Sequence, residues 1–213
     1  PLVSLGDLVW VDEDGDGQYG GTEQPIAGVR VDLLDGAGNA AVDALGAPVP
    51  FATTDADGRY SFSNLLPGDY QVRFTLPSGY VWTVSNTGGD GLDSDPLYGS
   101  RSDATATTAT FALSATPVTD SDTNPARRIV TDPTIDAGVV PLVSLGDLVW
   151  IDADRDGQFD AGEAPIAGVT VTLLDGTGAP AVDAAGNTVA DAATDADGRY
   201  QFDSLVPGDY IVR

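Results

Sequence analysis

The chain has 213 residues, with 33 acidic and 9 basic side chains and a formal net charge of -24, which repels nucleic acid and attracts divalent cations. It contains no histidine, cysteine or methionine, so imidazole bases, thiolate nucleophiles and the usual ligands of zinc, haem and iron–sulfur clusters are missing. Only oxygen ligands remain, and these suit hard cations such as calcium. Neither nucleic-acid binding nor enzymatic activity is therefore expected.

Hydrophobic residues make up 42% of the chain, which is enough to build a core. No apolar run approaches the roughly 18 residues that cross a bilayer, so no membrane span is predicted in this fragment. The chain opens with Pro1, without a signal peptide or an initiator methionine, and we expect it to be a piece of a longer protein.

Apolar and polar residues alternate along much of the chain, which indicates half-buried β-strands. Strands are expected, in chain order, at residues 5–11, 29–33, 59–62, 70–74, 80–84, 105–113 and 134–139. Clusters of Gly, Pro, Asn and Asp between them are typical of turns. About seven short strands, with no convincing amphipathic helix, predict an all-β, immunoglobulin-like sandwich.

The three tryptophans allow two interpretations. Exposed aromatic rings can stack on sugars, but Trp10, Trp82 and Trp150 lie in apolar strand patterns. Because Trp10 directly precedes an acidic loop at the end of a strand, we favour burial against the opposite sheet over a sugar-binding platform.

The sequence repeats itself. PLVSLGDLVW at residues 1–10 returns unchanged at 141–150, and residues 1–73 share 49 of 73 positions with residues 141–213 without a gap. The predicted domains are a complete repeat at 1–140 and the first part of a second, truncated repeat at 141–213. Because this second copy lacks an equivalent of 74–140, we expect its sheet to stay open or to be completed by strands from a neighbouring chain.

The junction between the copies runs through Val140, Pro141 and Leu142, without a Gly/Ser linker. A short apolar connection that contains proline restricts bending. The sequence therefore predicts that successive repeats form a stiff rod.

A loop of the EF-hand type follows the first predicted strand in each copy. In DEDGDGQYGGTE at 12–23, aspartates occupy positions 1, 3 and 5, glycine position 6 and glutamate position 12. Alternate carboxylates converge on one point when such a loop curls. The second copy has the same pattern, with Arg155 in place of Gly15 and Asp160 in place of Gly20. The predicted Ca²⁺ ligands are Asp12, Asp14, Asp16, Gln18, Glu23, Asp152, Asp154, Asp156, Gln158 and Glu163.

The alternative interpretation is that Asp-Gly-Asp-Gly forms only a turn. Two matching loops favour calcium, because four carboxylates so close together would repel each other without a cation. We therefore expect the loop to lose its order when calcium is removed. Strands rather than paired helices flank the loop, which favours a constitutive structural site over an opening switch.

Two further acidic segments are less specific. GGDGLDSDPLYG offers Asp90, Asp93 and Asp95, and Asp136 lies in the last predicted strand of the repeat. These residues could form a second calcium site or a solvated acidic loop, and the spacing leaves both open. The segment TDADGRY, at 54–60 and again at 194–200, is interpreted as a hairpin turn.

The motifs GDLVW, DEDGDGQ with Glu23, PIAGVRVDLLD, TTDADGRYSF and LLPGDYQVRF resemble the B domains of serine-aspartate-repeat (Sdr) adhesins. Those domains belong to the wider collagen-adhesin (Cna) B-type, transthyretin-like group. The resemblance implies a calcium-binding β-sandwich in a stalk that projects an adhesive head. It places the EF-hand-like site on the residues named above and suggests Asp90, Asp93, Asp95 and Asp136 as further ligands. Many relatives carry a lysine–asparagine isopeptide bond, which this lysine-free chain cannot form.

The leading functional hypothesis is a calcium-stiffened stalk, spacer or fibre segment of a bacterial extracellular surface adhesin. Its expected partners are calcium and neighbouring repeats of the same chain. One alternative is a module that binds a host or cell-surface ligand through residues 90–102. Another is a filament subunit that is completed by strands from other copies of itself.

Overall fold

The computed structural model describes residues 2–87, 91–114 and 130–213, and every regular element within these ranges is a β-strand. The chain divides into two compact units, Pro1–Pro141 and Leu142–Arg213. Across the described ranges, no helix has the length and hydropathy that a membrane span would need. The all-β prediction is confirmed.

The described residues of unit 1 form twelve strands arranged in three sheets. A three-stranded sheet has the order β11-β1-β6, and a four-stranded sheet has the order β3-β2-β12-β8. The largest sheet has the order β10-β7-β4-β5, with β9 also paired to β7. The strands are β1 (Val3–Leu5), β2 (Val9–Val11), β3 (Gln24–Pro25), β4 (Arg30–Asp35), β5 (Ala52–Thr53), β6 (Phe62–Leu65), β7 (Gly68–Thr75), β8 (Tyr80–Trp82), β9 (Thr105–Thr107), β10 (Phe111–Leu113), β11 (Val130–Asp132) and β12 (Ala137–Pro141).

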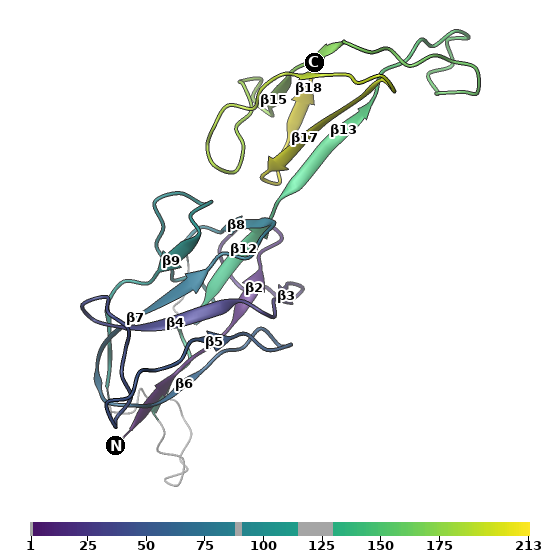
Figure 1. Ribbon diagram of the computed structural model, residues 1–213. Coiled ribbons are helices and arrows are strands. Elements are labelled where there is room, and N and C mark those ends of the chain that lie inside the picture. The colour runs from purple at the N-terminus through teal and green to yellow at the C-terminus, as the bar shows by residue number, and fades with distance from the viewer. Residues whose placement is uncertain (1, 88–90, 115–129) are drawn as a thin grey trace. The chain divides into compact units, whose positions relative to one another are not determined.

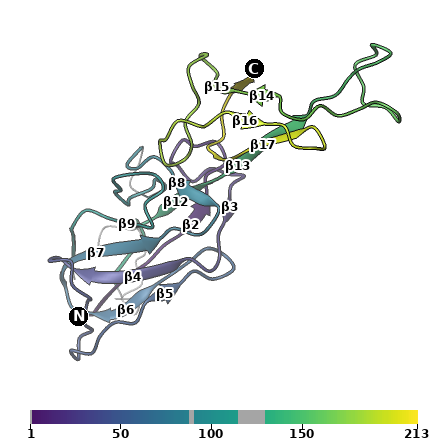
Figure 2. The same cartoon turned by 45° about the horizontal axis from the view of Figure 1, so that its top comes forward.

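The core of unit 1 follows from the two-residue period of its strands. On β7, Tyr70, Val72 and Phe74 are buried, whereas the residues between them are half-buried. The antiparallel register with β4 places Val31 opposite Phe74 and Leu33 opposite Val72. These four side chains therefore form one apolar face. Figures 1 and 2 both show β4 and β7 side by side.

Two predicted strands are broken. Residues 5–11 form β1 and β2 instead of one strand. Gly6 (φ 150°), which follows β1, lies so close to a neighbouring segment that a Cβ there would be 2.2 Å from the carbonyl oxygen of Tyr60. After this break the chain changes sheets, since β1 pairs with β6 and β11, whereas β2 pairs with β3 and β12. Residues 105–113 likewise divide into β9 and β10, where the Thr108 hydroxyl accepts a hydrogen bond from the Val72 amide.

The tryptophans of unit 1 are core residues, as predicted. Trp10 and Trp82 are 0% and 1% exposed. Trp10 contacts Tyr19 edge-to-face, and the indole N–H of Trp82 donates to the carbonyl oxygen of Asp103 at 2.9 Å. The sugar-platform alternative is therefore excluded for these two rings, whereas Trp150 in unit 2 is only half-buried.

Unit 2 forms three two-stranded sheets, β13-β17, β14-β16 and β15-β18. Its buried core consists of Val171, Leu173, Ala181, Phe202 and Leu205. Residues that match core positions of unit 1 are open: Val143 is 39% and Val212 42% exposed, whereas their equivalents Val3 and Val72 are 1% and 0% exposed. The strands are β13 (Val143–Leu148), β14 (Thr170–Val171), β15 (Leu173–Asp175), β16 (Ala192–Ala193), β17 (Arg199–Leu205) and β18 (Tyr210–Val212).

Two adjacent leucines test this account of the core. Leu65 is 0% and Leu66 53% exposed. We expect Leu65→Ala to lower the free energy of unfolding by about 2–5 kcal/mol, because it leaves a cavity. Leu66→Ala should change it by no more than about 0.5 kcal/mol. Urea unfolding of the whole chain measures both values, and equal losses would contradict the assignment of the core.

Candidate metal centre

The loop after β2 is organised around a buried carboxylate. Asp12 is 0% exposed, and its Oδ1 accepts the amide of Gly15 at 2.6 Å. Its Oδ2 accepts the amide of Gly17 at 2.8 Å and the hydroxyl of Thr83. With both oxygens held, the side chain of Asp12 points into the curl of the loop.

The two other aspartates of the first loop converge on Asp12. One carboxylate oxygen each from Asp12, Asp14 and Asp16 lie within 4.8 Å of one another. Asp14 accepts the amide of Asp16 at 3.2 Å, and Asp16 accepts the amide of Gln18 at 2.7 Å. These bonds between residues two positions apart bend the chain so that alternate side chains share one side of the loop.

Glycine is required at the sharpest point of the loop. Gly17 has a φ of 80°, and a Cβ there would lie 2.5 Å from both the Thr87 hydroxyl and the Val84 carbonyl oxygen. A side chain at this position would therefore be strained and would also push residues 84–87 away. This is the role that the EF-hand pattern gives to its sixth residue.

Glu23 and Gln18 are placed differently from the three aspartates. Glu23 is 8% exposed, and its carboxylate closes the loop by accepting the amides of Gly20 at 2.6 Å and Glu13 at 3.1 Å. Burial raises the pKa of Glu23. Gln18 forms an antiparallel bridge to Asp93. Glu23 does not belong to the group of three oxygens, so the structure brings together three of the four predicted carboxylate ligands of the first loop.

The second loop has the same backbone turn in a more exposed setting. Asp152 accepts the amides of Arg155 at 2.6 Å and Gly157 at 3.1 Å. Arg155 adopts a φ of 66°, a conformation that Gly15 takes more easily in the first loop. Two groups of oxygens lie within 4.8 Å of one another, Asp152 with Asp154 and Glu163, and Asp154 with Asp156 and Asp160. The backbone amide of Gln158 donates to the carboxylate of Asp156 at 2.8 Å.

Of the four residues predicted as a second acidic site, the three that the structure describes, Asp93, Asp95 and Asp136, do not form one group. Asp90 lies outside the described residues. Asp93 is 6% exposed, sits beside Gln18, and its Oδ1 has no hydrogen-bond partner. Asp95, two residues further along the chain, accepts a hydrogen bond from the backbone amide of Asp136 at 2.6 Å. Within the described ranges, no group of three ligand oxygens joins Asp93, Asp95 and Asp136.

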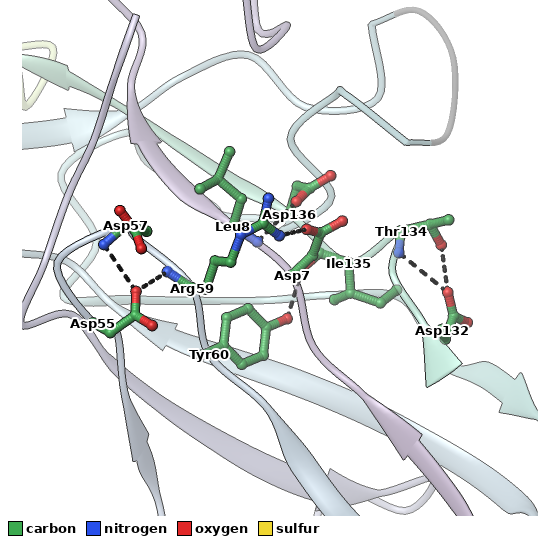
Figure 3. A network of polar contacts seen from close by, with 10 residues as sticks. All are labelled: Asp7, Leu8, Asp55, Asp57, Arg59, Tyr60, Asp132, Thr134, Ile135 and Asp136. Atoms are coloured by element: carbon green, nitrogen blue, oxygen red, sulfur yellow. Dashed lines mark hydrogen bonds and ion pairs between the residues drawn. The ribbon is translucent and has the colours of Figure 1, made fainter. Parts of the chain in front are cut away.

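Asp136 instead belongs to a buried polar network that the sequence analysis did not find (Figure 3). It is 3% exposed and accepts the amide of Leu8 at 3.1 Å. Burial, followed by the nearby charge of Asp7, raises the pKa of Asp136 to about 8. Burial also raises the pKa of Asp7, although Arg59 forms an ion pair with it at 3.2 Å. The available signal was the motif GDLVW, in which Asp7 recurs as Asp147.

The same view shows the predicted hairpin turn beside this network (Figure 3). Asp55 accepts the amides of Asp57 and Arg59, both at 2.9 Å, and the backbone amide of Gly58 donates to the Asp55 carbonyl oxygen at 3.0 Å. Asp195 forms the same bonds in unit 2. The turn interpretation of TDADGRY is therefore confirmed, and the turn presents Arg59 to Asp7.

The acidic loops fit a hard divalent cation. Their side-chain ligands are all oxygen atoms, they converge in groups of three, and Asp93 adds a buried oxygen without a donor beside the first loop. Calcium binds six to eight such oxygens, so backbone carbonyl groups and water would have to complete either sphere.

Together, the strands and the repeated acidic loops define a class of β-sandwich repeat domain. The family model for the SdrD B-like domain matches residues 3–139 and 143–213. The chain belongs to this family. Membership makes it a domain of extracellular, surface-exposed proteins and not an enzyme.

Curated relatives cover the whole chain. It is 37% identical to serine-aspartate repeat-containing protein F of Staphylococcus epidermidis over 215 residues, and 37% identical to protein I of Staphylococcus saprophyticus. It is 35% identical to protein E of Staphylococcus aureus over 214 residues. The chain spans only 11%, 10% and 15% of the lengths of these relatives.

Solved structures show weaker likenesses. A streptococcal ancillary pilin aligns with 99% of this chain and 52% of its own length, at 17% identity and a TM-score of 0.39. The shaft pilin SpaA of Lactobacillus rhamnosus GG aligns with 100% of this chain and 86% of its own length, at 11% identity and a TM-score of 0.35.

The raised pKa of Asp136 predicts how metal-free stability depends on pH. Because the pKa rises from 3.8 to about 8 on folding, the folded state prefers the protonated carboxyl group. This contribution is fully present below about pH 4 and is lost as the pH rises toward 8. In a chelator, Asp136→Asn should therefore flatten the decline in stability between pH 4 and 8. Urea unfolding at several pH values measures both slopes, and parallel slopes would contradict the assignment.

Proposed function

We propose that the chain is a calcium-stiffened structural repeat, acting as a stalk, spacer or fibre segment of an extracellular surface adhesin. In this proposal residues 1–140 are a complete repeat, and residues 141–213 are the first part of a second one. The main support is the convergence of carboxylate oxygens in both copies of the loop, at Asp12, Asp14 and Asp16 and again at Asp152, Asp154 and Glu163. Such groups are stable together when a cation offsets their mutual repulsion.

The position of the first loop explains how a bound ion would stiffen the unit. The loop joins β2 to β3, and the backbone amide of Asp12 donates to the Val139 carbonyl oxygen of β12 at 2.8 Å. Calcium would supply positive charge at the centre of the loop. Asp12, Asp14 and Asp16 would hold it there, so that opening the loop would require loss of the ion. Binding would thereby stabilise three neighbouring strands.

Other sources of rigidity are limited, which makes calcium more important to the stiffness of the repeat in this proposal. The chain has no cysteine for disulfides and no lysine for an isopeptide bond. Between the units, only Leu142 separates the end of β12 at Pro141 from the start of β13 at Val143. That successive repeats form a stiff rod stays a prediction from the proline-containing sequence of this connection.

Calcium-dependent stability tests the proposal. Extracellular sites bind calcium at about 10⁻⁴ to 10⁻³ M, so 10 mM calcium should stabilise a loop by about 1.4–2.7 kcal/mol. We expect Asp16→Ala to reduce the rise in melting temperature between chelator and calcium. Glu13→Ala removes the same charge from a residue of the loop outside the predicted ligands, and it should leave most of this rise intact. Identical melting of the wild-type chain with and without calcium would refute the proposal.

A second candidate is self-assembly, and the exposed apolar residues of unit 2 favour it. Val143 and Val212 are open where Val3 and Val72 are covered. Strands from another molecule would bury both valines if they packed on unit 2 in the way that the later strands of unit 1 pack on Val3 and Val72.

Sedimentation of the purified chain over a range of concentrations separates the two candidates. Self-assembly predicts a mass that increases with concentration, and Val212→Asp should reduce this association because it places a charge on the open face. A strictly monomeric, folded chain at every concentration would rule out self-assembly and would leave the structural-repeat proposal unchanged.

A further inference from the structure

The first loop is held from outside by a segment of its own repeat that lies about 70 residues later in the sequence. We call this segment the latch and define it as residues 83–87 and 91–95. The Thr87 hydroxyl donates to the carbonyl oxygen of Asp16 at 2.8 Å, and the amide of Tyr19 donates to Leu92 at 2.6 Å. The amide of Ser94 donates to the carbonyl oxygen of Gly17 at 3.1 Å. The loop and the latch therefore form one hydrogen-bonded body.

Thr83 is the latch residue that reaches a candidate ligand directly. Its hydroxyl donates to Asp12 Oδ2, and both side chains belong to residues that are 0% exposed. Thr83 is itself fixed, because its amide donates to Gly138 at 3.2 Å and its carbonyl oxygen accepts the hydroxyl of Tyr98 at 2.7 Å. A buried hydrogen bond from a fixed donor to a carboxylate restricts where that carboxylate can point.

The second loop shows the same turn without this support. Asp152 receives backbone amides from Arg155 and Gly157, and no hydroxyl donor to it occurs in the described part of the chain. It is half-buried, whereas Asp12 is fully buried. The backbone curl therefore forms from local sequence alone. The hydroxyl bond from Thr83 is the contact of the Asp12 carboxylate that has no counterpart at Asp152 in the described residues.

We propose that Thr83 is a positioning residue that orients Asp12 for calcium, so that the affinity of the first loop depends on the second half of its own repeat. This inference rests on the proposed calcium function. It extends that function because it makes ion binding a link between residues 12–23 and the latch. Occupancy of the loop then stabilises strands β8 and β12 as well as β2 and β3, since Thr83 follows β8 and pairs with Gly138 of β12.

Calorimetric titration of calcium into the whole chain tests the role of Thr83. The titration is done in an Asp154→Ala background, which removes a member of both oxygen groups of the second loop. Thr83→Val keeps the shape but loses the hydroxyl, and it should weaken binding to the first loop about tenfold or more. Thr83→Ser keeps the hydroxyl and should stay within about threefold of the parent chain. Thr108→Val is the matched control, because it removes a buried hydroxyl that bonds the Val72 amide and not a residue of the loop or the latch, and it should also stay within this range.

A purely structural role for Thr83 gives a different result. Thr83→Val would then lower the melting temperature equally in chelator and in calcium, while the calcium affinity stayed at the parent value, and this would overturn the inference alone. A parent chain that binds no calcium would overturn the inference together with the proposed function.

Hydrogen exchange on the wild-type chain provides a test that does not depend on the folding of a variant. Addition of calcium should slow exchange of the Tyr19 and Ser94 amides, which join the loop to the latch. Slower exchange within residues 12–18 only, with Ser94 unchanged, would contradict the coupling.

Discussion

The first unit is organised around one fully buried carboxylate, that of Asp12, whose oxygens need hydrogen-bond donors. The backbone amides of Gly15 and Gly17 donate to it, and so does the hydroxyl of Thr83, the residue after β8. Two further carboxylates lie against it. In water these carboxylates would repel each other and move apart. Burial makes the lack of a nearby positive charge more costly. A cation at this point would resolve the conflict, and the strands that meet there would gain stability from it.

The charge of the whole chain leads to the same conclusion. In the described ranges, arginine side chains form ion pairs with Asp7 and Asp32 only. Other carboxylates accept hydrogen bonds from backbone amides in turns, as at Asp35, Asp43 and Asp55. This use of aspartate builds tight turns without lysine or disulfides. It also leaves a strongly acidic protein, for which divalent cations are the natural counter-ions outside the cell.

Local patterns in the sequence predicted the parts of the structure that depend on nearby residues. The two-residue period placed Val72 and Phe74 in the core, and the loop spacing placed Asp12, Asp14 and Asp16 together. Contacts between distant segments could not be predicted in this way. The change of sheet after Gly6 depends on the pairing of β1 with β6 and β11 and of β2 with β12, and the network of Asp7 and Asp136 depends on the position of the last strand of the repeat. The bond from Thr83 to Asp12 spans 71 residues, so no local spacing indicates it.

X-ray diffraction from crystals grown in millimolar calcium tests the central claim most directly, because anomalous scattering locates the ion itself. The account predicts a calcium peak at about 2.3–2.6 Å from carboxylate oxygens of Asp12, Asp14 and Asp16, and a second peak in the loop that starts at Asp152. Ordered loops with hydrated carboxylates turned toward solvent, and no anomalous peak at either position, would contradict it.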